Sequence, residues 1–247
     1  MCTVILLRRP GHSWPLVLAA NRDERLDRAW DAPATHWPDY PGVVGGRDRM
    51  AGGTWMAAGR GGIVAAILNR PGSLGPAAGK ASRGALPLMA ASQRSAREAA
   101  ERLVDLDAGC FRPFNLVVAD RDEAFFLRAL GEGRPDATGL PEGVSMVTAH
   151  DANDLSSPRI QRHLPRFQAA APPDPAQRDW AAWEALLADD SLGPAGVADA
   201  LRVPAVKGFG TICASLFALG ASGAVRWRFC PTPAGMAAFR DISLPGG

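Results

Sequence analysis

The chain has 247 residues, 47% of them hydrophobic, and 27 basic against 25 acidic side chains give a formal net charge of +2. This balance excludes the strong positive field by which many proteins bind nucleic acid or anionic membranes. No hydrophobic run reaches membrane-spanning length. The hydrophobic stretch at the start of the chain is too short for a secretory signal, and its arginines follow the stretch instead of preceding it. We therefore expect a single cytoplasmic domain over residues 1–247, without nucleic-acid partners or integral membrane association.

Short hydrophobic runs separated by turn residues predict the strands. The first two runs, at residues 3–7 and 16–20, flank Pro10-Gly11-His12-Ser13, which is typical of a hairpin turn. Residues 25–50 are rich in Pro, Asp and Trp and are expected to be irregular. The remaining predicted strands are residues 53–58, 63–69, 114–119, 124–130, 144–148, 211–219 and 224–229.

Capping residues and prolines predict the helices. Ser95 and Glu98 have the spacing of a capping box, and two later prolines each follow a Ser or an Asp, as first-turn prolines do. The predicted helices are residues 83–91, residues 95–106 and two that begin at Pro158 and Pro175. Strands grouped around helix pairs predict an α+β fold with two stacked, mainly antiparallel sheets and helices on their outer faces, a four-layer α/β/β/α sandwich.

The spacing of cysteines and histidines favours no metal site. The four cysteines form no Cys-x-x-Cys motif, which indicates neither a zinc site nor a disulfide framework, and a reducing compartment is the default. The four histidines are equally dispersed. These residues are Cys2, Cys110, Cys213 and Cys230, and His12, His36, His150 and His163.

Cys2, directly behind Met1, is the strongest candidate for a catalytic residue. If Met1 is removed, one residue carries both a thiol nucleophile and an α-amine whose ordinary pKa, about 7.7 to 8.0, suits a general base. The alternative is a small buried cysteine that happens to follow the initiator.

The segment Asn21-Arg22-Asp23-Glu24 returns beside Cys2 after the first hairpin. Asn21 and Asp23 alternate along an extended chain, so both can point to one face, and that face can be the one of Cys2. Asp23 would then orient the amine, while Arg22 would lower the pKa of the thiol. The alternative is a solvated turn with surface ion pairs.

Asn69 ends a hydrophobic run and precedes Arg70-Pro71-Gly72. Its side-chain amide could stabilise the oxyanion of a tetrahedral intermediate, or it could simply begin the turn. The paired glycines before Arg47 and before Thr54 allow close backbone approach to a ligand or serve tight turns.

Eight motifs occur in a fixed order along nearly the whole chain. They are Met1-Cys2, Asn21-Arg22-Asp23-Glu24, Gly45-Gly46-Arg47-Asp48, Ala51-Gly52-Gly53-Thr54-Trp55, Ala66-Ile67-Leu68-Asn69-Arg70, Ser82-Arg83-Gly84, Phe114-Asn115-Leu116-Val117-Val118-Ala119-Asp120 and Gly208-Phe209-Gly210-Thr211. Together they resemble the NRDE-motif family, the transport and Golgi organisation protein 2 family.

The resemblance implies the N-terminal nucleophile hydrolase fold, with a start similar to bile salt hydrolases and penicillin V acylases. It implies hydrolysis of a linear amide, a C–N bond, without a required cofactor. The implied roles are Cys2 as nucleophile and base, Asn21 and Asp23 as orienting groups, and Asn69 as oxyanion donor. Arg22 is a further candidate catalytic residue, and Trp55 and Arg83 are candidate substrate-binding side chains.

The sequence departs from these families at three places. The acylases have an arginine directly before the Asn-x-Asp segment, where this chain has Ala20, and Arg22 is the candidate replacement. Thr211-Ile212-Cys213-Ala214 stands where family members have Thr-Arg-Ser-Ser, and Ala149-His150 stands where they have Ser-Asn. Two expected polar groups are therefore missing.

Two other functions stay open. The family is associated with haem trafficking and lipid homeostasis, so the chain could be a non-catalytic carrier of haem or another amphipathic ligand, in a cleft lined by residues such as Trp55. Cys230, before Pro231, would then be a possible axial haem ligand, although a strand that ends at proline is the simpler interpretation. The third possibility is a scaffold for protein partners through the Trp- and Pro-rich residues 30–41.

Overall fold

The computed structural model describes residues 2–231 and 238–244, and the chain divides into two compact units. The first unit consists of Met1–Asp27, Pro141–Thr148 and Ala152–Ile242. The second consists of Arg28–Leu140, Ala149–Asp151 and Ser243–Gly247. Each unit has a sheet and a hydrophobic core of its own. A single domain over residues 1–247 stays a prediction.

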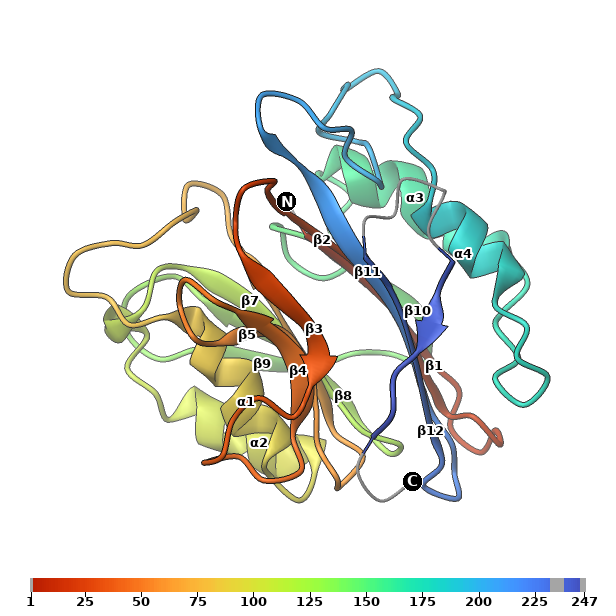
Figure 1. The fold of residues 1–247 in the computed structure, drawn as a ribbon, viewed down its shortest axis with the longest axis horizontal. Coiled ribbons are helices and arrows are strands. Elements are labelled where there is room, and N and C mark those ends of the chain that lie inside the picture. The colour runs from red at the N-terminus through yellow and green to blue at the C-terminus, as the bar shows by residue number, and fades with distance from the viewer. Residues whose placement is uncertain (1, 232–237, 245–247) are drawn as a thin grey trace. The chain divides into compact units, whose positions relative to one another are not determined.

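The first unit is built on a six-stranded sheet in the order β10-β1-β2-β11-β12-β13, in which every neighbouring pair is antiparallel (Figure 1). The predicted first hairpin is confirmed, but its second strand continues through the Asn21 segment, which is therefore not a turn. The strands are β1 (Thr3–Arg8), β2 (Leu16–Arg25), β10 (Gly143–Val147), β11 (Phe209–Leu219), β12 (Val225–Pro231) and β13 (Arg240–Asp241).

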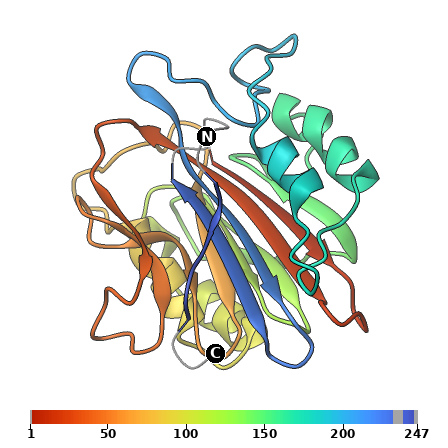
Figure 2. The same cartoon turned by 45° about the vertical axis from the view of Figure 1, so that its right-hand side comes forward.

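Two helices, α3 (Pro158–Ala169) and α4 (Ala181–Leu187), cover one face of this sheet (Figures 1 and 2). Alternate strand residues such as Ile5 and Leu216 pack there against Phe167 and Trp183. The rings of Phe167 and Trp183 meet edge to face, with centroids 5.1 Å apart. Side chains alternate between the two faces of a strand, so every second residue points toward the helices and the others point to the opposite face.

The second unit contains a seven-stranded antiparallel sheet in the order β3-β4-β5-β6-β7-β8-β9. The helices α1 (Leu86–Ala91) and α2 (Ala96–Val104), preceded by the 3₁₀ turn η1 (Arg83–Ala85), pack on one of its faces. A further 3₁₀ turn, η2 (Ala108–Cys110), follows α2. The strands are β3 (Trp30–Ala34), β4 (Val44–Asp48), β5 (Thr54–Ala58), β6 (Val64–Asn69), β7 (Phe114–Ala119), β8 (Ala124–Ala129) and β9 (Asp136–Gly139).

The capping predictions for two helices are confirmed. Ser95 accepts a hydrogen bond from the backbone N–H of Glu98 at 3.1 Å, and Ser157 caps α3 with Pro158 in its first turn. The helix predicted to begin at Pro175 is wrong, because the chain forms a tight turn there. The Asp174 carboxylate accepts the N–H groups of Ala176 and Gln177, at 3.0 and 3.2 Å, and α4 begins only at Ala181.

The prediction that residues 25–50 are irregular is also wrong, since β3 and β4 lie within them. Ion pairs lie across these two strands. Asp31 of β3 stands opposite Arg47 of β4 and binds its guanidinium, and Arg49 binds the same carboxylate. In the following loop Trp37 and Tyr40 pack against a small core cluster, so the Trp- and Pro-rich segment is ordered by its own unit.

Two glycines of the motifs allow two backbone segments to touch. A Cβ on Gly53 would lie 2.5 Å from the backbone carbon of Gly84, and one on Gly84 would lie 3.0 Å from the backbone nitrogen of Thr54. Real Cβ atoms essentially never come within 3.0 Å of backbone, so Gly53 accepts no side chain unless the chain moves, and a side chain at Gly84 would require a smaller shift of its neighbours. These glycines therefore join η1 to β5.

Gly53→Ala is expected to destabilise the protein by about 1–3 kcal/mol, because neither backbone segment can move away without breaking its own contacts. The free energy of unfolding from urea titration measures this loss. Gly139→Ala is the matched control, since a Cβ there meets nothing within 4 Å. Equal stability of the two variants would contradict this role for Gly53.

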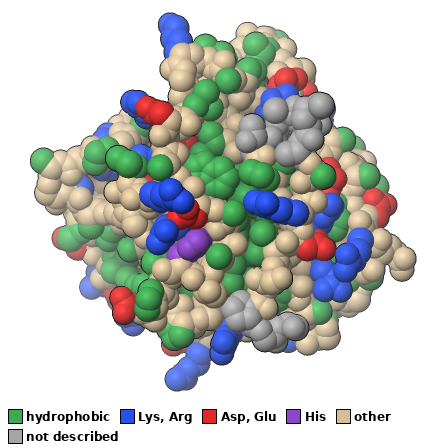
Figure 3. Space-filling model, in the orientation of Figure 1, with side chains coloured by type: hydrophobic (Ala, Val, Ile, Leu, Met, Phe, Trp, Pro, Cys, Tyr) green, Lys and Arg blue, Asp and Glu red, His purple; other side chains and the backbone are tan. Residues whose placement is uncertain are grey.

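The distribution of charge on the surface and the length of the helices can be compared with the sequence. Figure 3 shows basic and acidic side chains mixed over the face that it draws. Among the described residues, no helix is both long and hydrophobic enough to cross a membrane.

Candidate functional site

Cys2 lies directly before β1 in the first unit, and its side chain is half-buried. Its thiol is 3.6 Å from the backbone carbonyl oxygen of Asp23, to which it donates a hydrogen bond. Antiparallel pairing of β1 with β2 brings the two residues together, because Thr3 stands opposite Asn21. The predicted proximity of Cys2 and the Asn21–Glu24 segment is thus present in the structure.

The register also decides which side chains share a face. Since Thr3 is opposite Asn21, Thr3, Asn21 and Asp23 project to the side of α3 and α4. Alternation places Cys2 on the other face, the face of Arg22. The expectation that the Asn21 and Asp23 side chains share the face of Cys2 is therefore wrong, and Arg22 is the residue that does.

A β-bulge in β11 lets neighbouring positions of that strand serve both faces. Thr211 pairs with Asp23 and Cys213 pairs with Arg22, so two steps along β11 correspond to one step along β2. As a result the Thr211 hydroxyl reaches Asp23 on the helix side, while Cys213 stands opposite Arg22. Without the bulge, Thr211 and Cys213 would share one face.

Asp23 is fully buried and held from two sides. One carboxylate oxygen, Oδ2, lies 3.0 Å from Nη1 of Arg159, whose side chain is only 2% exposed. The other, Oδ1, accepts the hydroxyl of Thr211 at 2.5 Å. Arg159 Nη1 also donates to the hydroxyl of Thr3 at 3.0 Å. The buried ion pair and the hydroxyl hydrogen bond therefore hold the carboxylate in a fixed orientation.

The electrostatics of Cys2 follow from this environment. Burial raises the pKa of the Cys2 thiol above its ordinary value, the negative charge of Asp23 raises it further, and the charge of Arg22 acts in the opposite direction. A thiol with a raised pKa is protonated at neutral pH. Attack by its sulfur therefore needs a neighbouring base to accept the proton.

Asn21 is tied to the helices rather than to the thiol. Its amide nitrogen donates to the carbonyls of Leu187 and Leu201, at 3.1 and 3.2 Å. Its Oδ1 is buried, without a hydrogen-bond partner among the described residues, so this oxygen is the group left for an orienting role. Because Leu187 ends α4 and Leu201 follows the next loop, one amide joins both ends of that connection to β2.

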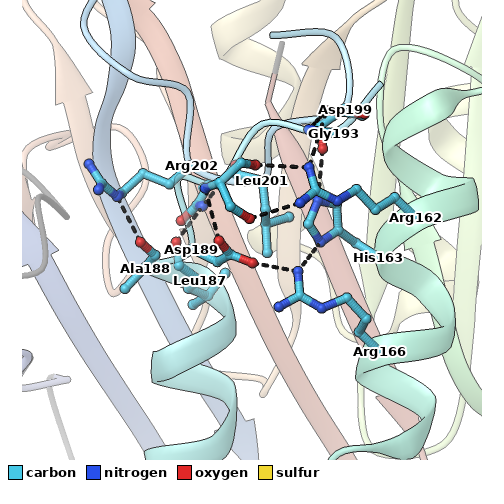
Figure 4. A network of polar contacts seen from close by, with 12 residues as sticks. Arg162, His163, Arg166, Leu187, Ala188, Asp189, Gly193, Asp199, Leu201 and Arg202 are labelled. Atoms are coloured by element: carbon cyan, nitrogen blue, oxygen red, sulfur yellow. Dashed lines mark hydrogen bonds and ion pairs between the residues drawn. The ribbon is translucent and has the colours of Figure 1, made fainter. Parts of the chain in front are cut away.

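The same connection is held by a polar network centred on His163 of α3 (Figure 4). Nε2 of His163 lies 2.7 Å from the Asp199 carbonyl, and Nδ1 lies 3.0 Å from the guanidinium of Arg166. A carbonyl only accepts and a guanidinium only donates, so the ring is neutral with its proton on Nε2. Arg166 continues to Asp189 at 2.5 Å.

The network reaches the carboxylate of Asp23 through Thr211. Val203 follows the connection, and its backbone N–H donates to the Thr211 hydroxyl at 2.7 Å. The backbone N–H of Thr211 returns a bond to the Val203 carbonyl at 3.0 Å. The loop after α4 thereby positions the Thr211 hydroxyl that binds Asp23.

The other predicted site residues lie in the second unit. Asn69 is the last residue of β6 and stands opposite Phe114 of β7. Trp55, half-buried on β5, meets Trp30 edge-on with ring centroids 5.9 Å apart. Arg83 donates to the Ser73 hydroxyl and to the Pro113 carbonyl, both at 2.9 Å, and so fastens the loop after β6. The structure brings Cys2, Asn21, Arg22 and Asp23 together within the first unit.

Sequence reasoning missed Arg159. It lies 136 positions after Asp23, in a helix, with no motif spacing to link the two. The available signal was indirect, since the sequence lacks an arginine at Ala20 and at Ile212 and a buried Asp needs a counter-charge. Thr3 was equally unmarked, because it looks like an ordinary β-branched strand residue.

The residues of the haem interpretation fit the group poorly. Cys230 is buried in the core between the sheet and its helices, and burial raises the pKa of its thiol, which disfavours a thiolate ligand. Within residues 2–231 and 238–244, no group of three His, Cys, Asp or Glu side chains is placed to hold a metal ion.

Several solved structures of hydrolases have a similar fold. A Caenorhabditis elegans N-acylethanolamine-hydrolyzing acid amidase ortholog matches with TM-score 0.56 and 11% identity, over 87% of this chain and 92% of that chain. The C2A mutant of conjugated bile acid hydrolase from Clostridium perfringens matches with TM-score 0.52 and 13% identity, over 98% and 92%. An arginine-to-leucine variant of that hydrolase gives TM-score 0.53 and 11% identity, over 97% and 92%.

At these identities the likeness shows the fold alone, and it confirms the predicted α+β class. No curated protein sequence matches the chain. The sequence profile of one family, described as Transport and Golgi organisation 2, matches residues 1–185 of the 247. The resemblance drawn from the eight motifs is thus confirmed, and the chain belongs to the Transport and Golgi organisation 2 family.

Proposed function

We propose that this protein is an N-terminal nucleophile hydrolase that cleaves a linear amide, with Cys2 as nucleophile. One observation supports this most: a half-buried thiol at the head of β1, hydrogen-bonded to the backbone of Asp23, whose buried carboxylate is held by Arg159 and Thr211. A buried acid beside a cysteine of raised pKa is an arrangement that active sites use and that a core rarely needs.

In the proposed reaction, removal of Met1 exposes the α-amine of Cys2 as the base. The amine takes the thiol proton as the sulfur attacks the amide carbonyl, and a tetrahedral oxyanion forms. The C–N bond then breaks, the leaving amine takes the proton, and a thioester remains on Cys2. Water, deprotonated by the same α-amine, attacks the thioester, and the acid departs as the thiol is restored.

The surrounding residues have distinct proposed roles. The negative charge of Asp23 favours the protonated α-amine after the first step. Asn21 offers its buried Oδ1 as a further hydrogen-bond acceptor. Arg22, on the face of Cys2, lowers the pKa of the thiol and replaces the arginine absent at position 20. Asn69 keeps its predicted role as oxyanion donor, and Trp55 and Arg83 keep theirs in substrate binding, all to be tested by substitution.

A panel of acyl-amides tests the proposal, after intact-mass measurement has established whether Met1 is removed. We expect the wild type to release amine from at least one acyl-amide, and Cys2→Ala to lose at least about 10³-fold in rate, because no other nucleophile replaces the thiol. Cys110→Ala is the matched control, since Cys110 is exposed and lies in the second unit. A retained Met1, or activity that survives Cys2→Ala, would overturn the mechanism.

Haem titration followed by absorbance separates the hydrolase from the carrier alternative. A hydrolase requires no cofactor, so we expect no saturable Soret shift. A saturable shift that persists in Cys2→Ala and disappears with a histidine or Cys230 substitution would favour a haem carrier instead.

A further inference from the structure

Arg159 occupies an unusual place for an arginine. It is in the first turn of α3, where the helix macrodipole disfavours positive charge, and its side chain is 2% exposed. Two unfavourable terms, burial and the dipole, therefore oppose the guanidinium here. The ion pair with Asp23 offsets them, so the position of Arg159 is tied to that carboxylate rather than to the stability of α3.

Arg159 also contacts the strand that carries the nucleophile. The same nitrogen that binds Asp23 donates to the hydroxyl of Thr3, the residue after Cys2, with both distances 3.0 Å. One guanidinium group thus links the first residue of β1 to the acid on β2. The planar geometry of the guanidinium makes this link directional.

The positive charge of Arg159 affects Cys2, in addition to the position of its guanidinium group. The negative charge of Asp23 raises the pKa of the Cys2 thiol, and it would raise the pKa of an α-amine at the same residue. A buried carboxylate without a counter-charge acts more strongly than one paired with a cation, because the two fields partly cancel. Loss of the Arg159 charge should therefore make both groups at residue 2 harder to deprotonate.

We infer that Arg159 is a positioning residue for the Cys2 site: it fixes the Asp23 carboxylate in one orientation and offsets its charge at the nucleophile. This inference rests on the proposed function of Cys2. A residue of α3 thus influences the reactivity of the Cys2 thiol, although no sequence motif includes that residue.

The test is the pH profile of Cys2 alkylation by iodoacetamide, with the labelled peptide identified by mass spectrometry. We expect Arg159→Met to shift the midpoint of the profile by about one pH unit to the alkaline side and to slow labelling at neutral pH by about tenfold. Arg159→Lys should restore most of the rate, because it returns the charge. Arg162→Met is the matched control on the same helix, since Arg162 binds Asp199 and Ser191 instead.

The double variant Asp23→Asn/Arg159→Met keeps the test decisive if the single variant fails to fold. It has no buried charge at this place, so its midpoint should lie at or below that of the wild type. A midpoint unchanged in folded Arg159→Met, or a double variant shifted to the alkaline side, would overturn the inference. Alkylation of Cys2 needs no substrate, so its pH profile can be interpreted even if the wild type cleaves no amide. Absence of amide cleavage would refute the proposed function but not this inference.

Discussion

Asp23→Leu is expected to lower the free energy of unfolding by about 3–5 kcal/mol, the largest effect of any single substitution in the site. The reason is that the Arg159 guanidinium, 2% exposed and 3.0 Å from the carboxylate, loses its counter-charge while it stays buried. The Thr211 hydroxyl loses its acceptor at the same time. Urea unfolding, read as a change of midpoint at constant slope, measures this loss.

Two further variants test the assignment to the buried pair. Asp23→Leu/Arg159→Leu removes both charges and should recover most of the lost stability, since hydrophobic replacement of a complete buried pair is often neutral. Glu24→Gln, at the neighbouring position, should cost less than about 1 kcal/mol, because Glu24 is partly exposed and its pair with Arg22 is 4.0 Å long. A double variant as unstable as the single one would show that packing, and not charge, dominates here.

The second large expected effect is a loss of stability in mild acid that is caused by His163. Burial lowers its pKa to about 4, and the charges of Arg166 and Arg162 act in the same direction. In the unfolded chain the ordinary value is about 6.5, so between these values the unfolded state binds the extra proton. Stability should therefore be complete above pH 6.5 and fall by about 2–3 kcal/mol as the pH decreases to about 4.

The variant His163→Gln should remove this dependence. Its amide nitrogen can still donate to the Asp199 carbonyl, but the side chain does not titrate, so the midpoint of urea unfolding should be nearly flat between pH 6.5 and 4.5. The carboxylate of Asp189, with a pKa lowered to about 2, loses its contribution only at lower pH, which separates the two groups. Equal slopes for wild type and His163→Gln would contradict this assignment.

Local signals predicted most of the strands of both units and three helices. The hairpin of β1 and β2 follows from hydrophobic runs around a turn, and the caps at Ser95 and Ser157 begin helices as their residue types require. The edge strand β9 was not predicted, because it is exposed along its whole length and has no hydrophobic alternation. β3 and β4 were missed because their Pro, Asp, Gly and Trp residues are typical of loops and show no regular hydrophobic alternation.

For the candidate site, the sequence identified the residues but not their faces. Cys2 and Asp23 are neighbours as expected, yet a register with Thr3 opposite Asn21 separates their side chains by the plane of the sheet. A shift of one residue would have reversed every face, and a single sequence does not contain that register. The bulge between Thr211 and Cys213 was equally hidden, although it decides which residue of β11 reaches Asp23.

The sequence by itself determined the charge balance, the order of the motifs and the presence of a cysteine next to an Asn-x-Asp strand, because these are properties of the chain read in order. Only the tertiary structure decided that the buried carboxylate of Asp23 is paired with Arg159 from α3 and bonded to Thr211 from β11. The physical reason is that a buried charge must find its partner in space, where folding places distant residues together, and no spacing along the chain records that choice.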